Sequence, residues 1–284
     1  APSWHDGTVI SSRFTLRQAE VPVLPAGARP IRILHISDLH LTPRRSREIG
    51  WIKSLAGLRP DFVISTGDHL AHPDAVGVAL DAMSDLMHIP GAFVLGSNDY
   101  YAPTLKNPLW YLKKDDGNRS HGAELPWREL VASLTTAGWQ DLDDHKAALT
   151  LSGLSIEFRG TDDAHLEMDH YEKVAGPRAK ESDLFIGVTH APYRRVLDAM
   201  ASDGADLVFA GHTHGGQVRL PWPGGSKALV TNCDLPTWRA RGLTRIKDEP
   251  WLHVSAGMGT SPYVPVRIAC APEATLLTLT TLIR

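Results

Sequence analysis

The chain has 284 residues, and its 29 lysines and arginines nearly balance its 32 aspartates and glutamates, for a formal net charge of −3. This balance excludes the strong positive field that draws proteins to nucleic acid or to anionic membranes, so we expect no nucleic-acid partner. With 43% apolar residues and no apolar run near the roughly 18 residues of a membrane span, the composition is that of a globule with a large core.

The first 30 residues predict an N-terminal arm. Residues 13–20 show some strand alternation, and prolines and a glycine interrupt residues 21–30. We assign residues 31–284 to a single domain. Because the chain begins at Ala1 instead of methionine, we expect that something upstream was removed: a signal peptide, a membrane anchor or residues lost by simple trimming.

Residues 31 to about 100 alternate short apolar runs with amphipathic segments. Ile49, Ile52, Leu55 and Leu58 would form the apolar face of one helix, and a second helix is expected between Val78 and Met87. Alternation of this kind predicts parallel strands covered by helices.

The stretch from about 100 to 128 interrupts this alternation with prolines, a run of polar residues and scattered aromatics. Loops of this length in compact domains are usually functional or disordered. The aromatic residues argue against disorder, so we expect an insertion that forms a cap beside the functional site. The alternative is an insertion that packs on the surface without a role.

The second half of the chain predicts more strands than helices. Helices are expected near 129–137 and at 193–202, and the turn at Ser152 and Gly153 predicts a hairpin. The expected fold class is α/β, a four-layer α-β-β-α sandwich of two mixed sheets. The strands expected in this half are 147–151, 154–159, 183–189, 206–210, 217–220, 251–255, 266–269 and 275–279.

Five of the apolar runs end in residues that can bind a metal. In open α/β sheets, ligands bind outside the carboxyl ends of the strands, so these side chains are expected at one edge. Seven nitrogen and oxygen donors are too many for one tetrahedral site and suit two metal ions. The candidate ligands are Asp38, His40, Asp68, Asn98, His190, His212 and His214.

Taken in order, these motifs resemble the calcineurin-like metallophosphoesterase superfamily. The motifs are Asp38-Leu-His40, Gly67-Asp68, Gly96-Ser-Asn98-Asp99, Thr189-His190 and Gly211-His212-Thr-His214. The run Gly211-His-Thr-His-Gly-Gly-Gln217 is similar to that of a bacterial subgroup whose members are often membrane-associated or exported. The resemblance implies membrane association or export for this chain, and a cytoplasmic location stays the alternative.

The resemblance also implies how the ligands are shared. Asp38, His40 and His214 would hold one metal ion, Asn98, His190 and His212 the other, and Asp68 would bridge them. A bridging carboxylate suits a pair of ions that clamps a phosphoryl group. Mixed imidazole, carboxylate and amide donors favour Mn, Fe or Zn, so we expect two such ions per chain as cofactors.

The third motif departs from the family pattern, which reads Gly-Asn-His followed by Asp or Glu. Aligned without a gap, Ser97 takes the ligand place and Asn98 the place of the histidine. Shifted by one residue, Asn98 keeps the metal and Asp99 takes the place of the histidine. We prefer the shift because serine is a poor ligand for such metals. Either way the usual histidine is missing, and Asp99 is one candidate for its role.

Several other polar residues have weaker signals. Arg44 and Arg45 follow His40 closely, and they either grip a second phosphate of the substrate or begin a solvated helix. Cys233 and Cys270 match no metal or redox spacing, and two free thiols are favoured over a disulfide. Four further histidines are expected to be structural or to support the ligands: His35, His69, His72 and His165.

The expected function is hydrolysis of a phosphate ester or anhydride by attack of a hydroxide activated by the two metals. A missing third-motif histidine favours diesters and anhydrides, whose leaving groups need less protonation. We therefore expect a phosphodiesterase or pyrophosphohydrolase. Its substrate would be a small-molecule, lipid-linked, cell-envelope or nucleotide phosphate. The protein would also associate peripherally with a membrane. The alternatives are a phosphomonoesterase and a metal-binding scaffold that has lost catalysis.

Overall fold

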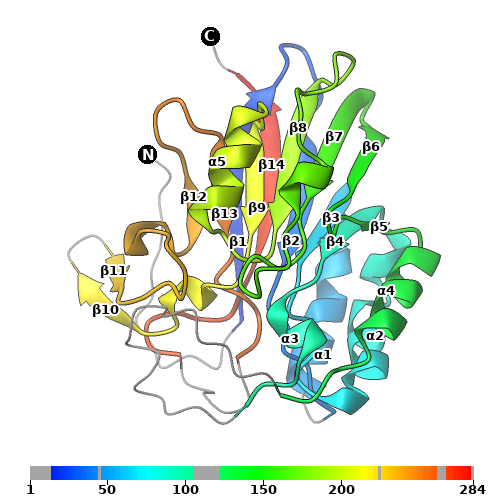
Figure 1. Cartoon of the computed structure of the whole chain (residues 1–284), viewed down its shortest axis with the longest axis vertical. Helices are drawn as coiled ribbons and strands as arrows, with labels where there is room; N and C mark the ends of the chain where they lie inside the picture. The colour runs from blue at the N-terminus through cyan, green and yellow to red at the C-terminus, as the bar shows by residue number, and fades with distance from the viewer. Residues whose placement is uncertain (1–13, 44–45, 105–121, 223–224, 261–266, 283–284) are drawn as a thin grey trace.

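The computed structural model describes residues 14–43, 46–104, 122–222, 225–260 and 267–282. Two six-stranded sheets lie face to face, and a short hairpin stands beside them (Figure 1). In spatial order the first sheet contains β1 (Thr15–Leu24), β14 (Glu273–Thr281), β2 (Ile31–Ile36), β3 (Phe62–Thr66), β4 (Gly91–Val94) and β5 (Gln140–Asp141). The second contains β12 (Gly242–Thr244), β13 (Trp251–Val254), β9 (Leu207–Ala210), β8 (Leu184–Thr189), β7 (Leu154–Gly160) and β6 (Lys146–Leu151), and the hairpin is β10 (Arg219–Trp222) with β11 (Gly225–Ala228).

Both sheets are mixed. In the first, β2, β3, β4 and β5 run parallel, and β14 runs antiparallel to β2. In the second, β7, β8, β9 and β13 run parallel, with β6 and β12 antiparallel at the edges. Because the central strands of each sheet are parallel, their carboxyl ends gather at one edge of that sheet.

The space between the sheets is filled by aliphatic and aromatic side chains. Phe62 of β3 stacks on Phe158 of β7 with ring centroids 4.9 Å apart, and both are fully buried. Ile64 and Ile186 belong to the same cluster. These strands are buried on both faces, and for this reason they read as continuous apolar runs instead of alternating ones.

Helices cover the two outer faces. Three helices pack on the first sheet, where Ile52, Val76 and Leu130 join the same cluster as Val63. The remaining long helix covers the second sheet through Met200 (Figure 1). The α-β-β-α sandwich expected from the sequence is confirmed. The helices are α1 (Ser46–Ser54), α2 (Val76–Met83), α3 (Ser97–Tyr100), α4 (Trp127–Thr136) and α5 (Arg194–Ser202).

Within the segment 1–30, expected as an arm with some strand alternation at 13–20, the structure forms β1, which pairs in parallel with β14 at the edge of the first sheet. The strand expected at 266–269 is wrong, because within the described residues this segment makes a single bridge, from Ile268 to Val218. The hydrogen-bonding groups of this segment serve the loop after His214 instead of a sheet.

Some expectations fall partly outside the described residues. Arg44 and Arg45 lie there, as does most of the expected insertion, whose residues 105–121 are not described. Cys233 and Cys270 are both thiols that form no disulfide, as favoured. In the described ranges, no helix has the length and apolarity needed to cross a bilayer.

Candidate metal centre

All seven predicted ligands follow the carboxyl ends of parallel strands. The loops after β2, β3 and β4 come from the first sheet, and those after β8 and β9 come from the second. Loops from both sheets therefore meet at one end of the sandwich. They carry, in that order, Asp38 with His40, Asp68, Asn98, His190, and His212 with His214.

The backbone at five of these residues adopts the left-handed conformation. The φ angles of Asp38, His40, Asp68, His212 and His214 lie between 43° and 67°. This conformation is uncommon outside glycine, and it persists only where the surrounding structure enforces it, most often at functional sites. The fold therefore holds these five side chains in place at a cost in local stability.

The first group of donors is a tight cluster. One ligand atom from each of Asp38, His40, Asp68 and His214 lies within 4.8 Å of the others. The Nε2 atoms of His40 and His214 are 3.1 Å apart, and His214 Nε2 is 3.5 Å from Asp38 Oδ1. These are distances that donors reach when they surround one cation. The cluster contains the residues expected at the first metal together with the expected bridge.

Asp68 faces a second group with its other oxygen. Its Oδ2 lies 3.4 Å from His40 Nε2, whereas its Oδ1 lies 3.6 Å from His190 Nε2. Asn98 contacts both oxygens: its backbone amide is 2.7 Å from Oδ1, whereas its side-chain amide is 2.8 Å from Oδ2, the oxygen that also faces His40. The ring of His212 meets that of His190 edge to face, 5.2 Å between centroids. Asp68 thus lies between the two predicted sets of ligands.

The histidine tautomers fit metal ligation. His190 Nδ1 lies 2.6 Å from the carbonyl oxygen of Thr66, to which it can only donate, so in the neutral ring that a metal binds Nε2 carries the lone pair. That Nε2 is buried and has no hydrogen-bond partner among the described residues. A backbone carbonyl that fixes the tautomer is typical of metal-bound histidines. His212 Nε2 is likewise 3.1 Å from the carbonyl oxygen of Asn232, which leaves Nδ1 for a metal.

The charges around Asp68 favour a cation. Burial would raise the pKa of Asp68, but the neighbouring His190 and His40 and the hydrogen bonds from Asn98 outweigh burial and hold this pKa below its usual value. Burial would lower the pKa of His190, but Asp68, Asp163 and Asp38 raise it to about 9. The carboxylates therefore attract positive charge, whether a proton or a metal ion.

A family model described as calcineurin-like phosphoesterase matches residues 31–216. The chain belongs to this family. It is a metal-dependent phosphoesterase, and the family uses a dinuclear metal centre. The resemblance read from the motifs is confirmed at the level of the family.

Three curated relatives cover most of this phosphoesterase. It is 28% identical to the uncharacterized protein YpbG of Bacillus subtilis, over 89% of this chain and 82% of the relative. It is 24% identical to the phosphodiesterase YaeI of Escherichia coli, over 94% and 88%. It is also 24% identical to the UDP-2,3-diacylglucosamine pyrophosphatase LpxG of Chlamydia trachomatis, over 93% and 88%.

In this phosphoesterase, Asp99 is bonded to the backbone around Asp68. Its Oδ1 accepts hydrogen bonds from the amides of His69 and Leu70, at 2.7 and 3.1 Å. Its Oδ2 accepts from the amide of Gly96 at 3.0 Å and lies 3.0 Å from His69 Nδ1. To replace the missing histidine as a proton donor, Asp99 would have to break these contacts.

Sequence reasoning missed the loop after β7 as part of the site. Asp163 in this loop is fully buried, its Oδ2 has no hydrogen-bond partner in the described structure, and burial raises its pKa to about 7 despite the nearby His190. The ring of His165 lies 4.4 Å from that of His212, and its Nδ1 is 3.1 Å from Tyr193 Oη. The sequence pattern that identified the ligands could also have identified Asp163, because Asp163 likewise follows the carboxyl end of a strand.

The other three histidines have separate roles. His35 and His69 are buried and hydrogen-bonded to neighbouring side chains. His72 accepts a hydrogen bond from the amide of Asp74 at the start of a short 3₁₀ helix. None of the three belongs to the donor cluster around Asp38.

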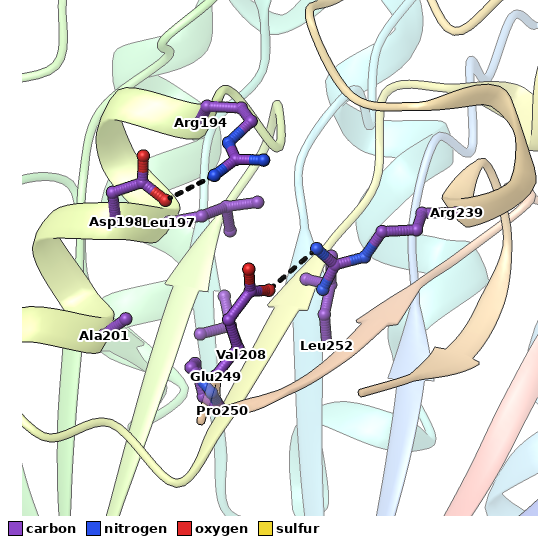
Figure 2. Close-up of a pocket in the computed structure, with 9 residues that line it drawn as sticks. All are labelled: Arg194, Leu197, Asp198, Ala201, Val208, Arg239, Glu249, Pro250 and Leu252. Atoms are coloured by element: carbon purple, nitrogen blue, oxygen red, sulfur yellow. Dashed lines mark hydrogen bonds and ion pairs between the residues drawn. The ribbon is translucent and has the colours of Figure 1, made fainter. Parts of the chain in front are cut away.

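A pocket between α5 and β13 is separate from this centre (Figure 2). Two ion pairs join residues of its lining: Arg194 to Asp198 at 3.3 Å and Arg239 to Glu249 at 2.9 Å. Its apolar lining includes Leu252. None of the seven predicted ligands lines this pocket, so it carries no part of the proposed chemistry.

Proposed function

We propose that this phosphoesterase is a two-metal phosphodiesterase or pyrophosphohydrolase that acts on a lipid-linked, cell-envelope or nucleotide phosphate. The position of Asp68 carries the proposal. One of its oxygens faces His40 and the other faces His190, so a single carboxylate adjoins both sets of donors.

Each metal would have its own set of protein ligands in addition to Asp68. Asp38, His40 and His214 would hold the first ion, and Asn98, His190 and His212 the second. Two bound ions would neutralise the charge on the phosphate oxygens and lower the pKa of the attacking water. The protein holds the ligands in fixed tautomers and fixed orientations, as the contacts from His190 to Thr66 and from His212 to Asn232 illustrate.

Two arguments support a diester or an anhydride as the substrate. The third motif reads Gly96-Ser-Asn98-Asp99, without the usual histidine, and leaving groups that are already stable anions need less protonation. Among the relatives, one is named a phosphodiesterase and another a pyrophosphatase of a lipid-bearing nucleotide conjugate. A phosphomonoesterase is the second candidate, because the same pair of metals can serve monoesters.

The proposal is tested by measuring metal content together with turnover of bis(p-nitrophenyl) phosphate and p-nitrophenyl phosphate in added Mn²⁺. About two metal ions per chain and faster cleavage of the diester are expected. Faster cleavage of the monoester would replace the proposal with a phosphatase. Two bound ions without turnover of either compound, or of UDP-2,3-diacylglucosamine, would favour a metal-binding scaffold that has lost catalysis.

Binding of a second phosphate of the substrate by Arg44 and Arg45 remains a prediction, since both residues lie outside the described ranges. If they bind the substrate, Arg44→Ala and Arg45→Ala raise the Michaelis constant for a diphosphate more than that for bis(p-nitrophenyl) phosphate. Peripheral membrane association is also a prediction, and co-sedimentation of the protein with anionic vesicles tests it.

A further inference from the structure

A line of buried hydrogen bonds runs from the proposed metal ligand Asp38 into the core between the sheets. Ser37 Oγ lies 2.6 Å from Asp38 Oδ2, and Thr66 Oγ1 lies 2.7 Å from Ser37 Oγ. His35 Nε2 is 2.9 Å from Thr66 Oγ1, and His35 Nδ1 is 2.8 Å from His253 Nδ1. We call these five residues the relay.

The chemistry of its members gives the relay one direction. An ionised Asp38 only accepts, so Ser37 donates to it and must accept from Thr66. Thr66 has then used its only hydrogen and must accept from His35 Nε2–H. A neutral His35 therefore presents a lone pair at Nδ1, and His253 donates to it from Nδ1–H. Every hydrogen in the relay points toward Asp38.

The relay is enclosed and joins the two sheets. His35, Ser37, Asp38 and Thr66 have no exposed surface, and His253 is 1% exposed. His35 belongs to β2 and Thr66 to β3 of the first sheet, whereas His253 belongs to β13 of the second. Hydrogen bonds in such an enclosed, low-dielectric environment are stronger and more exactly oriented than at the surface.

The glycine before His212 lies directly against the relay. A Cβ atom at Gly211 would overlap Ser37 Oγ, and it would stand 2.8 Å from Asp38 Oδ2 and 2.9 Å from Thr66 Oγ1. The amide of the next residue, His212, lies 3.2 Å from both oxygens of Asp38. The absence of a side chain at Gly211 lets the loop that carries His212 and His214 close over the relay.

We propose that His253, His35, Thr66 and Ser37 are positioning residues for Asp38, and that this relay sets the affinity of one of the two metal sites. Each member fixes the hydrogen-bond direction of the next, and Ser37 finally fixes the orientation of the carboxylate that binds the metal. Partners of this kind, one step removed from the metal, typically change metal affinity by 10- to 100-fold. The inference rests on the proposed two-metal function.

The test compares two identical substitutions on the strands that flank β2, Thr66 on β3 and Thr275 on β14. Thr66→Val keeps the shape of the side chain but removes both hydrogen bonds of the hydroxyl. Thr275→Val is the matched control, because Thr275 is 1% exposed, pairs with His35 in register, and its hydroxyl has no partner among the described residues. Mn²⁺ binding is measured by calorimetry on the whole protein.

Thr66→Val is expected to raise the dissociation constant of one of the two ions about tenfold and to leave the other unchanged. Thr66→Ser restores the hydroxyl and with it the affinity, and Thr275→Val matches the wild type. Ser37→Ala gives the same selective loss if Thr66→Val does not fold. Unchanged affinity for both ions in folded Thr66→Val or Ser37→Ala overturns the proposal.

A second measurement does not depend on metals. The ¹⁵N chemical shifts of the histidine rings in the metal-free protein are expected to show His35 protonated at Nε2 and His253 at Nδ1. The opposite tautomer at His35 overturns the relay even if the protein binds two metals. If the wild type binds no Mn²⁺ but shows these tautomers, the proposed function and the role of the relay in metal affinity both fail, while the hydrogen-bond direction of the relay stands.

Discussion

Asn98 binds Asp68 through two groups at once. Its backbone amide donates to Asp68 Oδ1 at 2.7 Å, and its side-chain amide donates to Asp68 Oδ2 at 2.8 Å. The carboxylate that lies between the two sets of donors is therefore oriented by the third motif. Ser97, the other residue considered for this place, only approaches the amide nitrogen of Asn98, at 3.4 Å.

Asn98→Ala is expected to lower the occupancy of one metal site and to reduce kcat about tenfold or more, because both a proposed ligand and an orienting contact are lost. Ser97→Ala is the matched control. It should retain activity within about twofold of the wild type, because it removes a hydroxyl that makes only a weak contact. Metal analysis and turnover of bis(p-nitrophenyl) phosphate check both. A larger loss in Ser97→Ala would restore the alignment without a gap.

Asp68→Asn is expected to remove most metal binding and most activity together, since a neutral amide cannot bridge two cations. Asp183→Asn serves as the control because Asp183 accepts a hydrogen bond from the amide of Ser155, at the opposite end of β7 from the site. Both variants are measured for metal content and turnover. An Asp68→Asn protein with wild-type metal content and kcat would refute the bridging role.

Asp99→Asn is expected to destabilise the fold more than it slows the reaction. The amide NH₂ group of the variant would face backbone N–H groups that now donate to Asp99, which costs about 1–3 kcal/mol for each unsatisfied contact. Urea unfolding measures the loss, and kcat per folded molecule should stay within about tenfold of the wild type. If instead kcat falls by orders of magnitude while stability is unchanged, Asp99 is the proton donor in place of the usual histidine.

The contribution of His253 to the stability of the protein is expected to fall as the pH drops from about 6.5 toward 4. Burial lowers the pKa of His253 from 6.5 to about 4, and burial lowers that of His35 as well. Between these pH values the unfolded chain binds a proton at His253 that the folded protein does not, so this contribution is complete above 6.5 and is lost toward 4. A shift of this size corresponds to about 3 kcal/mol for His253.

Urea unfolding at pH 7 and pH 5 measures this effect. His253→Gln has no titrating group at this position, so its stability should fall less between the two pH values than that of the wild type. An equal fall in both proteins would show that His253 is protonated in the folded state.

The sequence was sufficient for those features that depend on local patterns. Apolar runs such as 31–36 and 184–189 predicted buried parallel strands, and the polar residues one or two positions after them, Asp38 and His190, were correctly expected at the carboxyl ends. A strand must bury its apolar side chains, and its end must leave the sheet, so the polar residues that follow it closely are carried to the edge. For this reason the α-β-β-α architecture could be predicted without coordinates.

The tertiary structure alone decided which of these residues meet. Asp99 accepts hydrogen bonds from the amides of His69 and Leu70, which lie 30 and 29 residues earlier in the chain, and no local pattern indicates them. Asp163 likewise lies near the proposed metal centre only because β7 is next to β8 in the second sheet.

The same holds for the contacts between the sheets and for the edge strand β1. His253 reaches His35 only because β13 and β2 pack face to face, 218 residues apart in the chain. Strand order and sheet packing are set by the burial of side chains that lie far apart in the sequence. This burial is favourable because it minimises the exposed apolar surface of the whole molecule. The sequence therefore determined which residues can do the chemistry, and the packing of the two sheets determined how they are held.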